Sequence, residues 1–195
     1  MIEIRWHGRG GQGVWSGSAV LAYSAIKAGK YAQSFPQFGP ERIGGPVTAF
    51  NRIDDKPIVD RGPIYEPDIV IVIDPSLLKP RYMTSLLSGL KKGGYFLANS
   101  EKSPSELREE LDLPDEAHVW SVDATTIALE EIGRASPNTT MLGMLLAATN
   151  LLPVEYLEQG ILWRWPGSVG EKNINALKRA MKEAKSDPAK EVVSV

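Results

Sequence analysis

A glycine-rich segment near the N-terminus has the residue types and spacing to bind an anion. It follows the pattern G-x-G-x-x-G through Gly8, Arg9, Gly10, Gly11, Gln12 and Gly13. Glycines permit positive φ angles and close approach of a ligand, and the amides that open a following helix attract phosphate or carboxylate. Arg9 adds a positive charge beside them. The pattern indicates either an anion-binding loop or a tight turn that only lets the next helix pack closely.

A nicotinamide dinucleotide fits this segment poorly. Dinucleotide-binding folds place an Asp or Glu for the ribose about 20 residues after the glycines. The stretch from Lys30 to Pro40 contains no acidic residue. The sequence therefore disfavours NAD as the ligand.

A second segment combines prolines and glycines around two aromatic rings. It reads Phe35-Pro36-Gln37-Phe38-Gly39-Pro40-Glu41-Arg42-Ile43-Gly44-Gly45-Pro46 and is predicted to be too broken for regular structure. Long loops of this kind often carry function. A binding role and a plain surface loop with solvated Glu41 and Arg42 fit the composition equally well.

Other candidate residues carry weaker signals. His7 has no partner base nearby in sequence, which favours a strand-end histidine bonded to backbone over a proton donor. Ser16 and Ser18 also lack a neighbouring histidine, so capping or packing is favoured over a nucleophile. The run Trp163-Arg164-Trp165 fits either a partner-facing patch or rings that close the core at a helix end.

The composition argues against several classes of function. The 195 residues include 22 Lys and Arg against 24 Asp and Glu, too balanced for binding to nucleic acid or anionic lipid. No cysteine is present, so the chain supplies no thiolate for a disulfide, zinc or an iron–sulfur cluster. Only two histidines occur, far apart in sequence, which argues against a metal site. Neither a secretory signal nor a membrane-spanning run is visible, and we expect a cytoplasmic protein.

The glycine-rich segment needs a strand before it and a helix after it, and the sequence predicts both. Ile2 to His7 alternates apolar and polar residues, and Val14 to Ala28 has a helical period with Gly29 as a stop. Ile69 to Ile73 is a β-branched run typical of a central strand buried on both faces. Further strands are predicted at residues 47–53, 95–98 and 118–122.

Helical patterns separate and follow these strands. Ser103-Pro104-Ser105-Glu106 predicts a capping box, and Ser136-Pro137-Asn138 resembles a capped helix start. Helices are predicted at residues 125–132, at 139–149 with burial, and at 169–184 with an apolar face on the sheet. The fold class is therefore α/β, with a doubly wound, mostly parallel twisted sheet, helices on both faces and an antiparallel hairpin involving residues 47–53. We expect a single domain over 1–185 and a frayed tail over 186–195.

Four motifs, in order along nearly the whole chain, are similar to those of one family. GRGGQG and FPQFGPERIGGP resemble the γ subunits of pyruvate and related 2-oxoacid:ferredoxin oxidoreductases. Asn138-Thr139-Thr140-Met141-Leu142-Gly143 is similar to the family's Asn-Thr-x-Met-Leu-Gly helix start, and residues 171–177 resemble its C-terminal helix. Many relatives have Arg where Ile43 stands, which weakens the case for an anion contact at that position.

The resemblance implies a division of labour within a complex. Thiamine-diphosphate-binding and ferredoxin-like partner subunits (α, β and δ) would hold thiamine diphosphate, Mg and the iron–sulfur clusters, and ferredoxin would accept the electrons. This chain would shape the complex and accommodate coenzyme A without binding a cofactor alone. Pyruvate or a branched-chain analogue is the favoured 2-oxoacid. The alternatives are the indolepyruvate or 2-oxoglutarate enzyme, or a free-standing phosphate- or nucleotide-binding protein.

The implied contact residues lie in three segments. The turn contributes Gly8 to Gly13, with the amides of Gly10 to Gly13 facing either a phosphate of coenzyme A or a partner subunit. The remaining candidates are Gly39, Pro40, Glu41, Arg42, Gly44, Gly45, Asn138 and Thr139. No catalytic or metal-binding residue is predicted.

Overall fold

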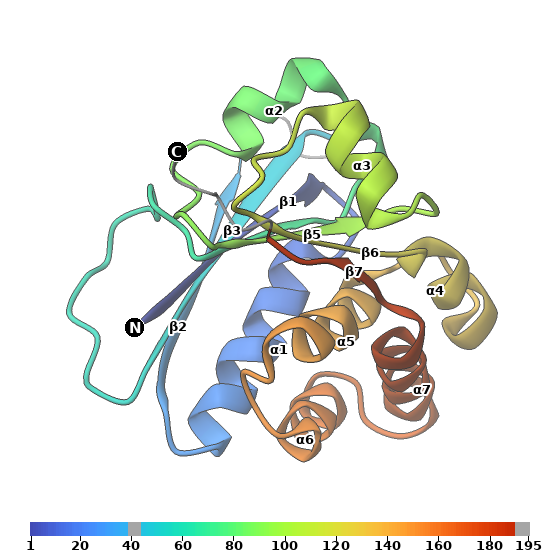
Figure 1. The fold of residues 1–195 in the computed structure, drawn as a ribbon. Helices are drawn as coiled ribbons and strands as arrows, with labels where there is room; N and C mark the ends of the chain where they lie inside the picture. The colour runs from blue at the N-terminus through green and yellow to red at the C-terminus, as the bar shows by residue number, and fades with distance from the viewer. Residues whose placement is uncertain (39–43, 190–195) are drawn as a thin grey trace.

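The computed structural model of the chain describes residues 1–38 and 44–189. Within them the strands form one seven-stranded sheet in the order β2-β3-β1-β4-β5-β6-β7 (Figure 1). The strands are β1 Ile2–Arg9, β2 Tyr31–Phe38, β3 Pro46–Asp54, β4 Ile69–Val72, β5 Tyr95–Asn99, β6 His118–Val122 and β7 Lys185–Asp187.

The sheet has a parallel centre and antiparallel edges. Strands β1, β4, β5 and β6 run parallel, while the hairpin β2–β3 joins β1 antiparallel and β7 joins β6 antiparallel. The expected α/β fold with a mostly parallel core and an added hairpin is confirmed. Strand β4 lies in the middle of the order, as its β-branched run predicts.

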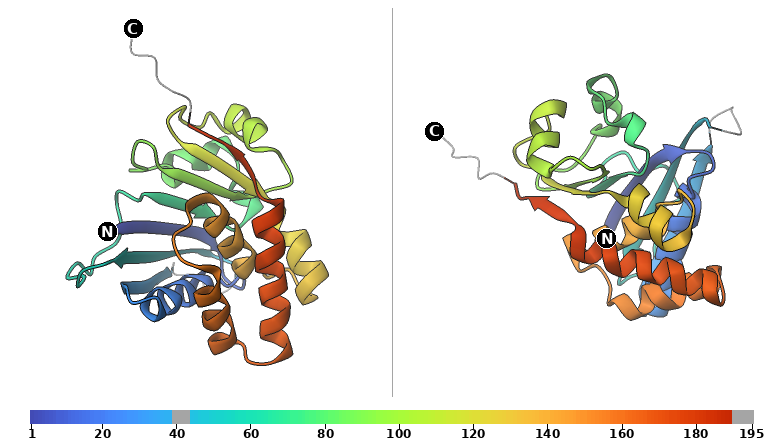
Figure 2. Two further views of the ribbon diagram at one scale, coloured as in Figure 1. Left: turned by 60° about the horizontal axis from the view of Figure 1, so that its bottom comes forward. Right: turned by 90° about the vertical axis from the view of Figure 1, so that its right-hand side faces the viewer.

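Helices cover both faces of the sheet. In Figures 1 and 2, α2 and α3 lie on one face, and α1, α4, α5, α6 and α7 lie on the other. The helices are α1 Val14–Lys27, α2 Pro80–Leu86, α3 Pro104–Leu111, α4 Ala124–Ile132, α5 Asn138–Thr149, α6 Val154–Arg164 and α7 Ser168–Glu183, with a short 3-10 turn at Pro75–Leu77. The predicted capping box of α3 is present, with Ser103 and Glu106 each bonded to the other's backbone amide.

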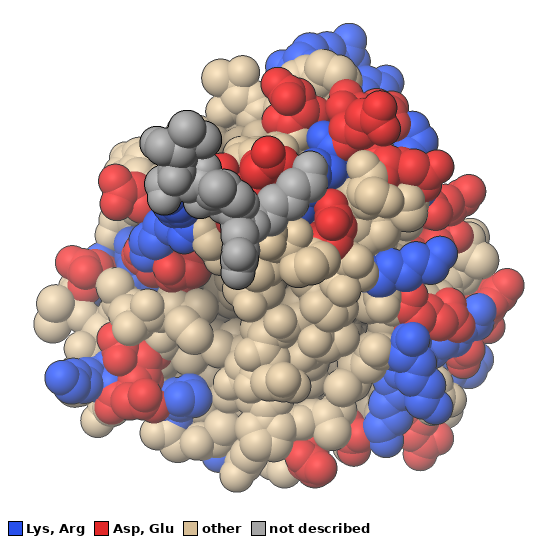
Figure 3. Space-filling view, viewed as in Figure 1, with Lys and Arg blue, Asp and Glu red and all other residues tan. Residues whose placement is uncertain are grey.

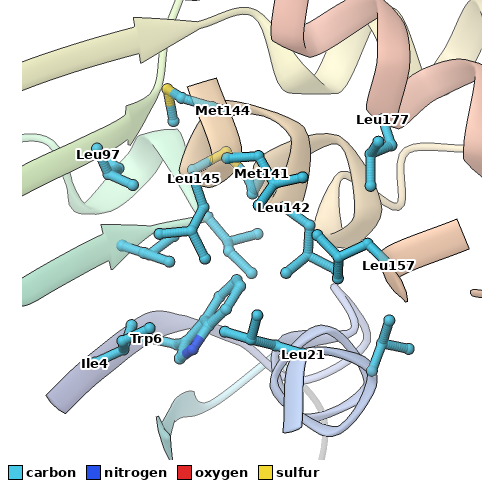
Figure 4. Packing of buried hydrophobic residues seen from close by; sticks show 14 of the residues in the cluster. Ile4, Trp6, Leu21, Leu97, Met141, Leu142, Met144, Leu145, Leu157 and Leu177 are labelled. Atoms are coloured by element: carbon cyan, nitrogen blue, oxygen red, sulfur yellow. The ribbon is translucent and has the colours of Figure 1, made fainter. Parts of the chain in front are cut away.

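The side chains of β4 alternate between two hydrophobic cores, because successive residues of a strand point to opposite faces. Ile69 and Ile71 face the larger core under α1 and α5, and Val70 and Val72 face the smaller core under α2 and α3. Figure 4 shows Trp6 of β1 lying among side chains of α1 and α5 in the larger core. The indole Nε1 of Trp6 donates to the Asn51 side chain at 2.8 Å, so the buried ring keeps its polar atom satisfied.

The second proline- and glycine-rich segment contains a strand, and the prediction that it lacks regular structure is wrong for its first part. Phe35, Pro36 and Gln37 belong to β2, where Pro36 pairs with Ala49 of β3. Strand β2 is an edge strand, and an edge tolerates a residue without an N–H. The part of the segment at residues 39–43 lies outside the described residues.

The C-terminal helix packs on other helices. Helix α7 packs mainly against α5, α4 and α6, so the prediction that it packs on the sheet is wrong. An amphipathic pattern shows which face is buried but does not identify the covering element. At the close contact, a Cβ on Gly143 of α5 would lie 2.2 Å from the Leu177 carbonyl oxygen of α7.

The segment after α7 is ordered further than expected. Ser186 and Asp187 lie in β7, which corrects a frayed tail beginning at residue 186; residues 190–195 lie outside the described part. The buried guanidinium of Arg108 holds this strand, donating to the Asp187 carboxylate at 2.5 Å and to its carbonyl oxygen at 3.1 Å. The side chain of α3 thus fixes a segment that has little apolar content of its own.

Candidate functional site

The glycine-rich segment lies at the switch point of the sheet. After β1 the chain passes to β2 and β3 on one side, whereas after β4 it passes to β5 on the other. Ligands of open α/β sheets bind where neighbouring strands diverge in this way, at their carboxyl ends. Strand β1 ends at Arg9, Gly10 to Gly13 form the turn, and α1 begins at Val14. The predicted strand, turn and helix are therefore present in a position suited to binding.

Three glycines of the segment make the turn possible. A Cβ on Gly8, inside β1, would lie 2.7 Å from Val14 Cγ2, so glycine lets α1 return directly against the strand. Gly11 and Gly13 have φ angles of 96° and 76°, in the region that glycine adopts without strain. A Cβ on Gly13 would also lie 2.4 Å from Asn138 Nδ2. The tight-turn alternative is thus correct for these glycines, and it does not exclude binding.

Two amides of the segment are used within the chain. Gly10 N–H donates to the Gly45 carbonyl oxygen at 3.0 Å, and Gln12 N–H donates to the Arg9 carbonyl oxygen at 3.2 Å. The bond to Gly45 also shows that the two predicted binding segments meet at this end of the sheet. The expectation that all amides from Gly10 to Gly13 face a ligand is therefore wrong for Gly10 and Gln12.

The remaining amides open onto a hollow of 290 Å³. Among residues 1–38 and 44–189, no hydrogen bond engages the amides of Gly11, Gly13, Val14, Trp15 and Ser16, and α1 has no side-chain cap. The hollow is lined by Arg9, Gly10, Gly11, Gly13, Val14, Trp15, Ser16 and Val47. Unpaired helix-terminal amides and the helix dipole together attract an anion, and the space suffices for a phosphate group.

Arg9 is held by a neighbouring carboxylate. Its Nε lies 2.8 Å from Asp74 Oδ2 and its Nη1 donates to the Gly44 carbonyl oxygen at 3.2 Å. Asp74 is nearly buried and also accepts the Ser76 amide at 2.8 Å. The pairing balances the charge of Arg9, so Arg9 adds less positive potential to the hollow than the sequence suggested. Sequence reasoning missed Asp74 and Ser76, although Asp74 directly follows a buried strand, a position that points to the carboxyl edge of the sheet.

Asn138 and Thr139 lie beneath the turn and support it. Both side chains are buried; Asn138 Nδ2 donates to the Gly13 carbonyl oxygen at 3.3 Å, and Thr139 Oγ1 donates to Asn173 Oδ1 at 2.8 Å. The residue at the N-cap of α5 is Pro137, which makes no side-chain cap, so the expected cap at residues 136–138 is wrong. In the described structure, Asn138 and Thr139 therefore support the turn from below. Gly39, Pro40, Glu41 and Arg42 lie outside the described residues.

His7 accepts a hydrogen bond from a side chain and not from backbone. Its Nε2 accepts from Arg5 Nε at 3.0 Å, and Arg5 Nη2 donates to the carbonyl oxygens of Leu86 and Ser88. Burial, and then the positive charge of Arg5, lower the pKa of His7 from 6.5 to about 3. A neutral imidazole that accepts a hydrogen bond from Arg5 has a structural role on the face of the sheet that α2 covers. Its role as a proton donor is not supported.

The remaining candidates have structural contacts or lie at the surface. Ser18 Oγ bonds to the Trp15 carbonyl and to Ser34 Oγ, which fits the packing role expected of it. Trp163 is exposed and stacks on Tyr23. In the described part of the chain, no group of three or more His, Asp or Glu residues is placed to hold a metal ion. Nor does any helix there have the length and apolar character to cross a bilayer.

The fold and the hollow define an α/β protein that presents helix-terminal amides at the switch point of a parallel sheet. Residues 3–183 match the family model described as pyruvate ferredoxin/flavodoxin oxidoreductase. The chain therefore belongs to the pyruvate ferredoxin/flavodoxin oxidoreductase family, as the four motifs indicated.

Relatives match the chain over almost their whole length. It is 48% identical over 183 residues to the pyruvate/ketoisovalerate oxidoreductases common subunit gamma of Thermococcus litoralis, covering 94% of this chain and 97% of that one. The crystal structure of pyruvate oxidoreductase subunit PORC from Thermotoga maritima superposes with a TM-score of 0.83 at 41% identity, covering 95% and 98% of the two chains.

A more distant structure shares the fold. The 2-oxoglutarate:ferredoxin oxidoreductase of Magnetococcus marinus, solved with 2-oxoglutarate, coenzyme A and succinyl-CoA, gives a TM-score of 0.74 at 19% identity. The match covers 93% of this chain and 30% of that one. The same fold therefore occurs within a longer polypeptide.

Proposed function

We propose that this chain is the γ subunit of a pyruvate- or 2-ketoisovalerate-type 2-oxoacid:ferredoxin oxidoreductase. The observation that carries the proposal is the match, over nearly the full length of both chains, to separate subunits with these names. The names favour pyruvate or ketoisovalerate over indolepyruvate and 2-oxoglutarate as the oxoacid. The complex would convert the 2-oxoacid and coenzyme A to acyl-CoA and CO2 and pass two electrons to ferredoxin.

The redox and decarboxylation chemistry belongs to partner subunits in this proposal. The chain has no cysteine to ligate an iron–sulfur cluster. Thiamine diphosphate with Mg would supply the carbanion stabilisation for decarboxylation, and the clusters would supply the electron path to ferredoxin. We expect these groups on thiamine-diphosphate-binding and ferredoxin-like subunits, and an isolated γ chain without activity. Its cytoplasmic location stays a prediction.

We further propose that the hollow beside α1 receives a phosphate group of coenzyme A. The unpaired amides at Gly11, Gly13 and the first turn of α1 support this, because an anion there also meets the positive end of the helix dipole. Trp15, half exposed at the rim, offers a ring to the rest of the ligand. Gly44 and Gly45 contribute by holding Arg9 and Gly10 and so fixing the shape of the turn.

A matched pair of variants at Ser16 tests the phosphate contact in the assembled enzyme. Ser16 lines the hollow in the first turn of α1, where a carboxylate favours helix formation but repels a phosphate. We expect Ser16→Asp to weaken coenzyme A binding by about 10-fold or more, which corresponds to roughly 1.4 kcal/mol. Ser16→Asn has the same size without the charge and should bind nearly as the wild type. Equal coenzyme A affinity in the two variants, measured by calorimetry, would refute the proposed phosphate contact.

A further inference from the structure

An ion pair between Arg9 and Asp74 lies beside the hollow at the start of α1. Arg9 Nε is 2.8 Å from Asp74 Oδ2. The Asp74 side chain is 8% exposed, whereas Arg9 is 35% exposed and belongs to the lining of the hollow, which does not include Asp74. The carboxylate therefore acts on a ligand in the hollow through Arg9 and through its charge, and not by direct contact.

Asp74 is held in place independently of its basic partner. Its Oδ1 accepts the Ser76 amide at 2.8 Å, so the side chain caps the 3-10 turn that follows. The preceding residue, Ile73, donates its N–H to the His7 carbonyl oxygen at 2.8 Å, and its own carbonyl oxygen accepts Asn99 Nδ2 at 2.8 Å. The strands on both sides of β4 thus fix its end, and the carboxylate is positioned before a cation reaches it.

The guanidinium of Arg9 is fixed in one orientation and keeps one nitrogen unused. Its Nε also donates to Ser76 Oγ at 3.3 Å, and its Nη1 donates to the Gly44 carbonyl oxygen at 3.2 Å. Within residues 1–38 and 44–189, Nη2 has no hydrogen-bond partner. A guanidinium presents its donors in a rigid fork, so Nη2 is available to a phosphate oxygen while Nε stays on Asp74.

The pair brings the local charge at the hollow close to zero. Arg9 is the one charged residue in the described lining. The formal net charge of the chain is −2, and Figure 3 shows positive and negative side chains close together around an uncharged area, so no strong field of one sign acts from that side. The affinity for a phosphate therefore depends on the helix-terminal amides and on the charges next to them. One unit charge at a partly exposed position changes this affinity about 10-fold.

We propose that Asp74 is a positioning residue that lowers the affinity of the hollow for coenzyme A, by holding Arg9 and cancelling its charge; this rests on the proposed phosphate contact. Coenzyme A and the acyl-CoA product carry the same phosphate groups, so this contact acts on both. Tighter binding of both lowers the KM without raising kcat and slows the release of product. Asp74 thus keeps the phosphate contact weak enough for the product to leave.

Four proteins that differ in charge at the pair test the proposal in the assembled oxidoreductase. The wild type and the double variant Arg9→Gln/Asp74→Asn are neutral there, Asp74→Asn leaves one positive charge, and Arg9→Gln leaves one negative charge. By calorimetry, we expect the dissociation constant of coenzyme A to fall about 10-fold in Asp74→Asn and to rise about 10-fold in Arg9→Gln. The double variant should return to within about 3-fold of the wild type.

Steady-state kinetics give a second readout that a purely structural role would not produce. Asp74→Asn should lower the KM for coenzyme A and strengthen inhibition by acyl-CoA, and both changes should shrink as the salt concentration rises. Asp74→Ser is a second neutral variant, because serine can still cap the 3-10 turn. It should tighten coenzyme A binding as Asp74→Asn does.

Asp123→Asn is the matched control for the loss of one carboxylate. Asp123 follows β6 at the same edge of the sheet and caps α4, where its Oδ1 accepts the Thr126 amide at 3.0 Å. Strand β6 is three strands away from β1, which corresponds to roughly 14 Å at the usual strand spacing. This distance exceeds the Debye length of about 8 Å at physiological ionic strength, so coenzyme A binding should not change.

The outcomes separate this inference from the proposed function. Unchanged or weaker coenzyme A binding in Asp74→Asn and Asp74→Ser overturns the inference, and so does equal tightening by Asp123→Asn. If thermal unfolding shows that neither single Asp74 variant is folded, the double variant must bind about 10-fold more tightly than Arg9→Gln, or the inference fails. These results leave the phosphate contact standing as long as Ser16→Asp binds more weakly than Ser16→Asn. Equal affinity in the Ser16 pair refutes the proposed contact itself.

Discussion

The contact between Gly13 and Asn138 predicts a specific energetic coupling between two segments far apart in sequence. Gly13→Ala adds a Cβ 2.4 Å from Asn138 Nδ2, at a φ of 76°. The left-handed conformation costs an alanine about 1–2 kcal/mol. Displacing the buried Asn138 side chain also weakens its bonds to the Gly13 carbonyl and the Thr139 amide, at about 1 kcal/mol each. We expect a loss of roughly 3–4 kcal/mol in unfolding free energy.

A double-mutant cycle isolates the contact from the backbone strain. Asn138→Ala alone should cost about 1–2 kcal/mol, because both hydrogen bonds are lost. In that background the new Cβ meets no amide group, so Gly13→Ala should cost only its strain, and the coupling energy should be about 1–2 kcal/mol. Urea unfolding of the four proteins gives this value. Gly11→Ala is the control, since a Cβ there meets nothing within 4 Å and should show no coupling to Asn138→Ala. Additivity of the Gly13 and Asn138 changes within about 0.5 kcal/mol would refute the reasoning.

Three further predictions concern groups that hold the fold. The fold favours the neutral form of His7, so the contribution of His7 to the unfolding free energy is complete above about pH 6.5 and declines as the pH falls towards 3. Between pH 7.5 and 5, urea unfolding should show the wild type losing about 2 kcal/mol more than His7→Gln. Equal losses in the two proteins would contradict this prediction. Arg108→Met should cost about 3 kcal/mol and increase hydrogen exchange in β7, because the Asp187 carboxylate loses its partner; unchanged exchange would contradict the anchoring role. Gly143→Ala should lower the unfolding free energy by about 1–3 kcal/mol in urea, because α5 and α7 must separate, and an unchanged midpoint would refute the close contact.

The sequence predicts the centre of this fold well because its signals there are local. Alternation in Ile2 to His7, the glycines after it and the helical period from Val14 give β1, the turn and α1 in order. The β-branched run at Ile69 to Ile73 gives the central strand, since burial on both faces leaves no polar alternation. Capping at Ser103 is likewise decided by residues three positions apart.

The predictions fail where the deciding contact is distant in sequence. Pro36 argues against a strand locally, yet the edge position of β2 makes it acceptable. Lys185 to Asp187 has no apolar pattern and becomes a strand through Arg108. At the site, the sequence predicts a free Arg9 side chain and a free Gly10 amide. Their partners Asp74, which follows the adjacent parallel strand β4, and Gly45 are both remote in sequence.

The lateral edges of the sheet limit how this subunit can assemble. Strand β2 contains Pro36, which offers no donor to an incoming strand, and β7 on the opposite edge is only three residues long and contains the charged Lys185 and Asp187. Short, charged or proline-containing edges prevent strand-to-strand association between molecules. Open-ended association of chains through strand pairing is therefore suppressed, even when the chain is synthesised before its partner subunits. Contacts with other subunits must therefore form through side chains. Such contacts depend on the identity of the residues, whereas backbone pairing does not.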